Sequence, residues 1–221
     1  MPVPAYIFDL DGTLVDSRHD LATAVNLMRR DLGLPGLSLE TVVGFVGDGM
    51  RRLVERALRA APASTADVDQ AIALLRGHYS EHLLDQTVLY PGVLASLEAL
   101  SRHPGHLAIV TNKPTEPARR ICAGLGILRF FPQLLGGDAC AKIKPDPTPL
   151  LQVLNATGAD PAFSWMIGDH STDLEAGRRA GLRRCFCRFG FGRAGTEVAE
   201  LSVDSLTEFA DHVLRRPVAP A

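Results

Sequence analysis

The sequence predicts an α/β fold in which a parallel sheet forms the core and a helical domain is inserted after the first strand. Short apolar runs typical of buried strands recur along the chain, and helical patterns separate most of them, as in parallel α/β sheets. The exception is the stretch from Ser17 to Leu84, which shows helical periodicity and no convincing strand. These observations predict one sheet interrupted by a helical insert.

The first strand is the apolar run at residues 6–8, which stops at Asp9. Such a run suits a buried parallel strand that enters a loop. In the insert, apolar residues recur at helical spacing, and Tyr90-Pro91-Gly92 marks its end. We therefore expect a core of residues 1–15 and 89–221 and a helical domain of residues 16–88. The three apolar stripes are Leu21, Val25, Met28 and Leu32; Met50, Leu53, Val54, Ala57 and Leu58; and Val68, Ile72, Leu75, Tyr79 and Leu83.

The remaining chain alternates between the two patterns. We predict strands at residues 107–110, 164–167 and 184–188, and a short one at 134–135. Helices are predicted at 115–124 and 147–157, and a further helix ends near Gly181. The tail at residues 216–221 is expected to fray.

Composition excludes several classes of protein. Hydrophobic residues make up 46% and charged residues 22% of the 221 residues, which excludes a disordered chain or a coiled coil. The net charge of −2 argues against a nucleic-acid partner. We expect no membrane segment, and four buried thiols rather than a disulfide or a zinc site. The sequence thus predicts a cytoplasmic protein, and it leaves open whether the protein is a monomer or a homodimer.

Polar side chains follow the predicted strands at their carboxyl ends, where open α/β sheets bind ligands. Several carboxylates in one small space cannot all stay ionised without compensation, and Mg²⁺ is the hard cation that suits oxygen ligands. With a hydroxyl and a lysine, this set suits phosphate chemistry, in which a carboxylate attacks phosphorus. The residues are Asp9, Asp11, Thr111, Asn112, Lys144 and Asp169.

Four motifs in order along the chain resemble those of the haloacid dehalogenase superfamily of phosphohydrolases. They are DLDGTLVDS at 9–17, TNK at 111–113, KPDP at 144–147 and GDHSTD at 168–173. Within that superfamily, VGDGM at 46–50, YPGV at 90–93 and FGFG at 189–192 are similar to segments of phosphoglycolate phosphatases. The resemblance implies a Rossmann-like core of the HAD fold with a cap domain. It also implies a Mg²⁺-dependent phosphatase of a small metabolite, first of all 2-phosphoglycolate, acting through an aspartyl-phosphate.

The resemblance also implies roles for the motif residues. Asp9 would be the nucleophile, and Asp11 would protonate the leaving group, which favours phosphoryl transfer over carbon–halogen cleavage. Thr111 would hold a phosphoryl oxygen, and Lys144 would neutralise the phosphoryl charge and orient Asp9. The metal ligands would be Asp9, Asp169 and Asp11, the last through its backbone carbonyl.

Other residues are assigned around this centre. Gly12 and Thr13 would let the backbone approach the phosphate, and Asn112 would lie near it. A substrate carboxylate needs a cation, which Arg51, Arg52 or Lys113 could provide, although adjacent arginines on a helix more often form a solvated face.

Two residues of the fourth motif have open roles. Asp173 orients Lys144 or the metal waters, or it caps the helix that begins there. His170 stands where the superfamily usually has Ser or Thr, and our hypothesis is that it adds a pH dependence to the reaction.

Lysines are rare in this chain, since only three of the 23 cationic residues are Lys and the others are Arg. Lys113 and Lys144 fall inside motifs, whereas Lys142 has no predicted role. The alternatives left open are a phosphatase of a sugar phosphate, nucleotide or pyrophosphate, and a phosphomutase. A non-enzymatic phospho-acceptor module fits neither the length nor the position of Asp9 on the first strand.

Overall fold

The computed structural model describes residues 3–60 and 64–215, so the tail expected to fray lies outside the described residues. Its core is a six-stranded sheet in the order β5-β4-β1-β6-β7-β8, in which every neighbouring pair is parallel. The predicted parallel α/β core is confirmed. The strands are β1 (Ala5–Phe8), β4 (His106–Val110), β5 (Gln133–Leu135), β6 (Trp165–Gly168), β7 (Arg183–Cys187) and β8 (Leu201–Val203).

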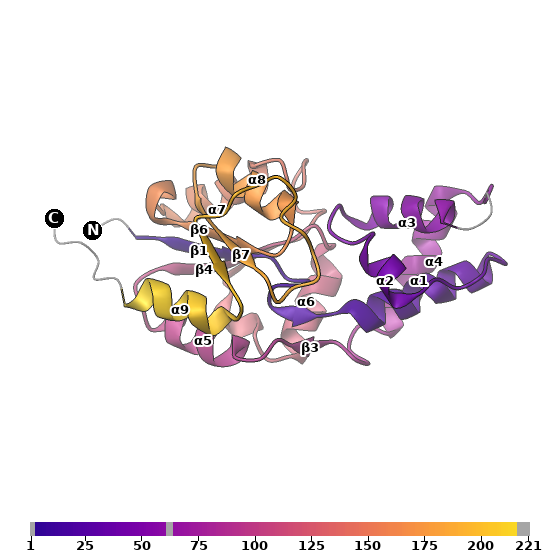
Figure 1. Cartoon of the computed structure of the whole chain (residues 1–221), viewed down its shortest axis with the longest axis horizontal. Helices are drawn as coiled ribbons and strands as arrows, with labels where there is room; N and C mark the ends of the chain where they lie inside the picture. Colours follow the sequence, from indigo (N-terminus) through magenta and orange to yellow (C-terminus); the bar gives the residue numbers. More distant parts are fainter. Residues whose placement is uncertain (1–2, 61–63, 216–221) are drawn as a thin grey trace.

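Helices cover both faces of the sheet (Figure 1). Successive residues of β1 point to opposite faces. Ile7 therefore packs with residues of α7, whereas Tyr6 and Phe8 make edge-on ring contacts with Phe209 of α9 at 6.0 and 6.2 Å between centroids. The central strands are buried on both faces, as expected for a parallel sheet. The core helices are α5 (Val93–Ser101), α6 (Thr115–Gly124), α7 (Thr148–Thr157), α8 (Ser171–Arg179) and α9 (Leu206–Leu214).

The insert between β2 and β3 contains helices only, among its described residues, and extends to one side of the sheet (Figure 1). Its apolar stripes pack against one another, with α1 against α2 and α4, and α3 against α4. The buried guanidinium of Arg29 on α1 donates hydrogen bonds to the carbonyls of Pro35 and Ala57, which fixes α1 to the end of α3. The helices are α1 (Arg18–Asp31), α2 (Leu39–Val43), α3 (Met50–Arg59) and α4 (Val68–Glu81).

The insert leaves and rejoins the core through a small antiparallel ribbon of β2 (Val15–Asp16) and β3 (Val88–Leu89). The predicted boundaries at 15/16 and 88/89 cut through this ribbon. The carboxylate of Asp20 on α1 accepts hydrogen bonds from the backbone N–H of Gln86 and from the N–H and hydroxyl of Thr87. One buried side chain thus ties the outgoing chain to the returning chain.

Some elements were not predicted. Helices α5 and α9, strand β8 and the ribbon lie in stretches to which we assigned no element, whereas the other core strands and helices lie within one or two residues of their predicted positions. Cys122, Cys185 and Cys187 are buried free thiols, and Cys140 is partly exposed. None of the helices described is both long and apolar enough to cross a membrane.

Candidate active site

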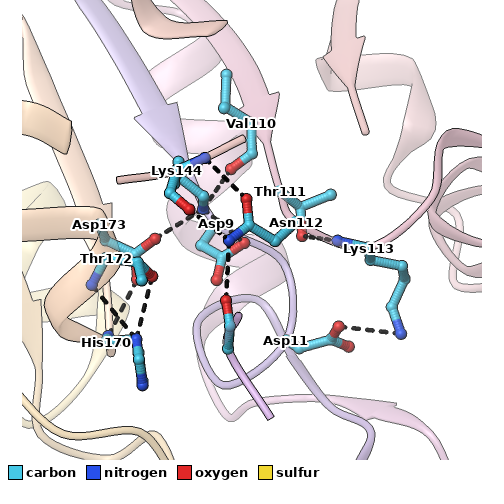
Figure 2. Close-up of polar contacts among 11 residues, drawn as sticks. Asp9, Asp11, Val110, Thr111, Asn112, Lys113, Lys144, His170, Thr172 and Asp173 are labelled. Atoms are coloured by element: carbon cyan, nitrogen blue, oxygen red, sulfur yellow. Dashed lines mark hydrogen bonds and ion pairs between the residues drawn. The ribbon is translucent and has the colours of Figure 1, made fainter. Parts of the chain in front are cut away.

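The site lies where three adjacent strands end. Asp9 follows β1, Thr111 follows β4 and Asp169 follows β6, and these strands are neighbours in the sheet. The backbone N–H of Asp9 still donates to the carbonyl of Ile167 (2.9 Å), so the loop begins in register with the sheet. The sheet therefore brings these predicted residues together, and Figure 2 shows Asp9 and Thr111 of this group.

Lys144 lies at the centre of this group, although it belongs to a loop between β5 and α7. Its ammonium is 3.0 Å from Oδ1 of Asp9 and 2.7 Å from Oδ1 of Asp173, and it donates to the carbonyl of Val110 (2.6 Å). Burial lowers the pKa of Lys144, but the Asp173 and Asp9 carboxylates outweigh that effect and raise the pKa above its ordinary value. The side chain is therefore a fixed positive charge beside Asp9.

Asp173 combines the two roles that the sequence left open. Its Oδ1 accepts from the Lys144 ammonium, and its Oδ2 accepts from the backbone N–H of His170 (3.0 Å). The His170 side chain in turn accepts from the N–H of Thr172, which completes a capping box at the start of α8. The helix cap thereby fixes the carboxylate that holds Lys144.

A group of carboxylates could hold a metal ion. Oxygen atoms of Asp9, Asp169 and Asp173 lie within 4.8 Å of one another. Both oxygens of Asp173 already accept hydrogen bonds, so Asp9 and Asp169 are the members best placed to face a cation. Asp11, the third expected ligand, lies outside this carboxylate group and was expected to use its carbonyl. Three carboxylates against one ammonium leave excess negative charge, which a hard divalent cation would balance.

Asp169 itself is almost fully buried. Its Oδ2 accepts hydrogen bonds from the N–H groups of Phe191 (3.0 Å) and Gly192 (2.7 Å). Burial, followed by the Asp173 and Asp9 charges, raises the pKa of Asp169 well above its usual range. A bound cation would reverse that effect by stabilising the carboxylate.

Gly12 is required at its position beside Asp169. Its φ is +80°, and a Cβ there would lie 1.9 Å from the Asp169 Oδ2. The loop after β1 can therefore close over the carboxylates only with glycine. The neighbouring Thr13 is buried, and its hydroxyl has no hydrogen-bond partner within the protein.

Asp11 faces a different set of partners from Asp9. Its Oδ1 accepts from the hydroxyl of Ser17 (2.5 Å), and its Oδ2 is 2.9 Å from the Lys113 ammonium. Lys113 also hydrogen-bonds the hydroxyl of Tyr79 on α4, whose ring centroid is 4.5 Å away. Burial lowers the pKa of Lys113, but the Asp11 charge and Tyr79 outweigh it and raise the pKa. Burial raises the pKa of Tyr79 to about 12.

Asn112 was expected to lie near the phosphate, but its amide makes other contacts. Its Oδ1 accepts from the N–H of Lys144 (3.0 Å), and its Nδ2 donates to the carbonyls of Lys144 and Gly47 (2.9 Å each). Both amide hydrogens are therefore engaged by backbone groups.

A cavity lies between these residues and the helical insert. Of the predicted residues, Asp9, Asp11, Thr111, Asn112, Lys113, Asp169 and His170 line it. The insert contributes a wall that is largely apolar, with Tyr79 as its polar side chain among the described residues. That wall consists of Leu21, Val46, Gly47, Gly49, Met50, Leu53, Leu75 and Tyr79.

The structure does not bring Arg51 into this cavity. Because α3 buries Leu53 and Val54 inside the insert, Arg51 and Arg52 point outward. The exposed guanidinium of Arg51 is 2.5 Å from Oδ1 of Asp69, and Arg52 pairs with Glu55. The solvated-face interpretation thus describes both arginines.

A family model described as haloacid dehalogenase-like hydrolase matches residues 6–187. The chain belongs to the haloacid dehalogenase-like hydrolases. A phosphoglycolate phosphatase of Cupriavidus necator is 38% identical over 225 residues, which cover 100% of this chain and 97% of the relative. A phosphoglycolate phosphatase of Chromobacterium violaceum is 39% identical, with 95% and 96% covered.

Solved structures agree with this assignment. A predicted phosphoglycolate phosphatase from Haemophilus somnus superposes with a TM-score of 0.88 at 31% identity, covering 96% of this chain and 97% of that chain. The predicted fold class and the predicted superfamily are both confirmed, and this hydrolase is a phosphatase that cleaves phosphoric monoesters.

Proposed function

We propose that this phosphatase hydrolyses 2-phosphoglycolate with Mg²⁺ through an aspartyl-phosphate on Asp9. The phosphoglycolate phosphatases among its relatives support the substrate. The observation that carries the proposal is the position of Lys113, whose buried ammonium lies in the cavity wall, 2.9 Å from Oδ2 of Asp11.

In the first step, a carboxylate oxygen of Asp9 attacks phosphorus, and the ester P–O bond breaks. The leaving oxygen takes a proton from Asp11, while Lys144 holds Asp9 in place and balances phosphoryl charge. Water then attacks phosphorus and gives a proton to Asp11, which releases phosphate and restores Asp9. A Mg²⁺ ion held by Asp9, Asp169 and the Asp11 carbonyl would supply further charge neutralisation at the phosphoryl oxygens.

The position of Lys113 favours a carboxylate on the leaving group. If Asp11 protonates the leaving oxygen, that oxygen lies beside Asp11 and therefore within a few ångströms of the Lys113 ammonium. In 2-phosphoglycolate, one methylene group separates the ester oxygen from the carboxylate. That carboxylate can thus pair with Lys113 while the ester oxygen faces Asp11.

The opposite wall argues against the alternatives. A sugar phosphate needs hydrogen bonds for its hydroxyls, whereas the insert offers mainly Leu, Val and Met side chains. A phosphomutase needs an acid or base from the cap, and the described cap residues that line the cavity include no carboxylate or imidazole.

A panel of phosphate esters tests this proposal. The wild type is assayed on 2-phosphoglycolate, ethyl phosphate, a hexose phosphate and a nucleoside monophosphate, with Mg²⁺ and with chelator. We expect the highest kcat/KM on 2-phosphoglycolate, no turnover in chelator and no trapped phosphoenzyme in Asp9→Asn. Preference for the hexose phosphate would refute the substrate, and full activity of Asp9→Asn would refute the mechanism.

A further inference from the structure

The side chain of Asn112 hydrogen-bonds two segments that lie far apart in the sequence, and Figure 2 shows it beside Lys144. One Nδ2 bond reaches Gly47, in the loop that precedes α3 of the cap. The other bonds of the amide hold both the N–H and the carbonyl of Lys144. We propose that Asn112 is a positioning residue, which couples docking of the cap loop at residues 44–49 to the placement of Lys144.

Within the cap, contacts with Arg56 of α3 hold the loop that contains Gly47. Arg56 on α3 donates from Nη1 to the carbonyl of Phe45 (3.0 Å), and its Nη2 lies 2.5 Å from Oδ2 of Asp48. The two contacts bracket Gly47. The loop is therefore held to α3, and the position of the Gly47 carbonyl depends on the position of the cap.

Gly47 also sits directly on His170 of the core. Its φ is +120°, and a Cβ at this position would lie 2.8 Å from Nε2 of His170. The ring is oriented by its Nδ1 contacts with Thr172, so it cannot simply turn away. The cap loop thus packs against the His170 ring at the same residue, Gly47, that accepts the hydrogen bond from Asn112.

On the core side, Lys144 needs an external support. It lies in a loop outside regular secondary structure, yet its ammonium must stay beside Asp9. Asn112 supplies that support from the end of β4. Its own backbone is closely backed by Gly137, where a Cβ would lie 2.6 Å from the Asn112 carbonyl oxygen.

This arrangement explains why Asn112 is a poor candidate for a phosphate ligand. Its two amide hydrogens are used, and the remaining lone pair on Oδ1 would repel a phosphoryl oxygen. If the cap loop withdraws, one Nδ2 hydrogen of Asn112 loses the Gly47 carbonyl as its acceptor. The same Asn112 side chain holds the backbone of Lys144. Docking of the cap and placement of the lysine therefore stabilise each other.

The inference rests on the proposed role of Lys144, and its test does not depend on the substrate. Asn112→Asp keeps the shape but loses both donors, and Asn112→Ala removes the amide without adding charge. Hydrogen–deuterium exchange is measured with Mg²⁺ and orthovanadate. We expect faster exchange in both variants at residues 44–50 and at 143–147, segments far apart in the sequence.

Kinetics on p-nitrophenyl phosphate provide the second readout. We expect kcat of Asn112→Ala to fall about tenfold to 100-fold, as for a misplaced catalytic group, with KM changing less than threefold. Gly47→Ala should lower kcat because its Cβ collides with His170. The double variant Gly47→Ala/Asn112→Ala should then have a kcat only slightly lower than that of Gly47→Ala, because both substitutions disrupt the same contact between Asn112 and Gly47. Gly44→Ala is the matched control, because its Cβ meets only the Glu40 and Thr41 carbonyls at 3.5 Å.

Unchanged exchange at residues 44–50 in both Asn112 variants would overturn the proposal, as would fully additive losses in the double variant. Failure of the proposed function gives a different result. If the wild type does not prefer 2-phosphoglycolate, or Asp9→Asn stays active, the substrate or the mechanism falls while the exchange result still reports the coupling.

Discussion

The ammonium of Lys144 lies 2.7 Å from Oδ1 of Asp173, and the two side chains are 1% and 0% exposed. Such a pair is costly to bury and still more costly to break, because the remaining charge loses its partner. Here the remaining charges would be the carboxylates of Asp173, Asp9 and Asp169, and the Asp173 and Asp9 charges already raise the pKa of Asp169. Lys144 therefore stabilises the fold as well as the site.

Lys144→Met is expected to lower the free energy of unfolding by about 3–5 kcal/mol at neutral pH. Urea titration followed by circular dichroism measures this loss. The matched control is Lys142→Met two residues away, whose exposed ammonium is 3.1 Å from Asp146. An exposed pair contributes only about 0–1 kcal/mol. Equal losses of unfolding free energy in the two variants would contradict a stabilising role of the buried Lys144 ion pair.

Lys113→Met is expected to reduce selectivity for a carboxylate on the leaving group. A hydrogen bond to a charged group contributes about 1.5–3 kcal/mol. The ratio of kcat/KM for 2-phosphoglycolate to that for ethyl phosphate should thus fall roughly tenfold to 100-fold. This ratio cancels any general damage to Asp11. Arg51→Met serves as the control and should leave the ratio unchanged; a drop there instead would assign the carboxylate to the cap arginine.

Mg²⁺ is expected to raise the melting temperature of the wild type, because it binds the folded acidic group and not the unfolded chain. At 100 times the Kd, the gain is about 2.7 kcal/mol. Asp169→Asn should abolish the shift, whereas Asp69→Asn on the surface of α4 should retain it. Differential scanning calorimetry with and without Mg²⁺ decides the matter, and an equal shift in Asp169→Asn would exclude Asp169 as a ligand.

Asp146 should contribute an acid-sensitive part of stability. Hydrogen bonds from the side chain and backbone of Thr148, with a smaller effect of Lys142, lower the pKa of Asp146 from 3.8 to about 2. A lowered folded-state pKa stabilises the fold above pH 3.8, and this contribution is lost as the pH falls through 2. The difference in Tm between wild type and Asp146→Asn should therefore be full at pH 6 and shrink between pH 4 and 2. A Tm difference that stays constant down to pH 2 would show that it does not come from the Asp146 carboxylate.

The sequence predicts the core of the site well because that core depends on local signals. Buried strands are recognisable as apolar runs, and their carboxyl ends meet in any parallel sheet. The positions of Asp9, Thr111 and Asp169 follow directly. Lys144 follows only from its motif, since its loop has no periodicity.

Contacts across the cavity could not be predicted in the same way. Tyr79 belongs to an apolar stripe, and nothing local shows that its hydroxyl meets Lys113. The outward direction of Arg51 agrees with the apolar stripe of α3, but the sequence does not show that its guanidinium pairs with Asp69 of α4. The ribbon escaped prediction because two-residue strands are too short to show alternation. Helix α9 did carry a readable stripe, at Leu206, Phe209, Ala210 and Val213.

The ribbon of β2 and β3 has a consequence for how such enzymes can diversify. Val15 faces Leu89 and Asp16 faces Val88, so the helical insert begins and ends about one strand spacing apart, roughly 4.8 Å. A foreign insert therefore has to satisfy a single geometric condition, that its two ends arrive side by side. Specificity could then be exchanged as a module while the strands that carry Asp9 and Asp169 remain where they are.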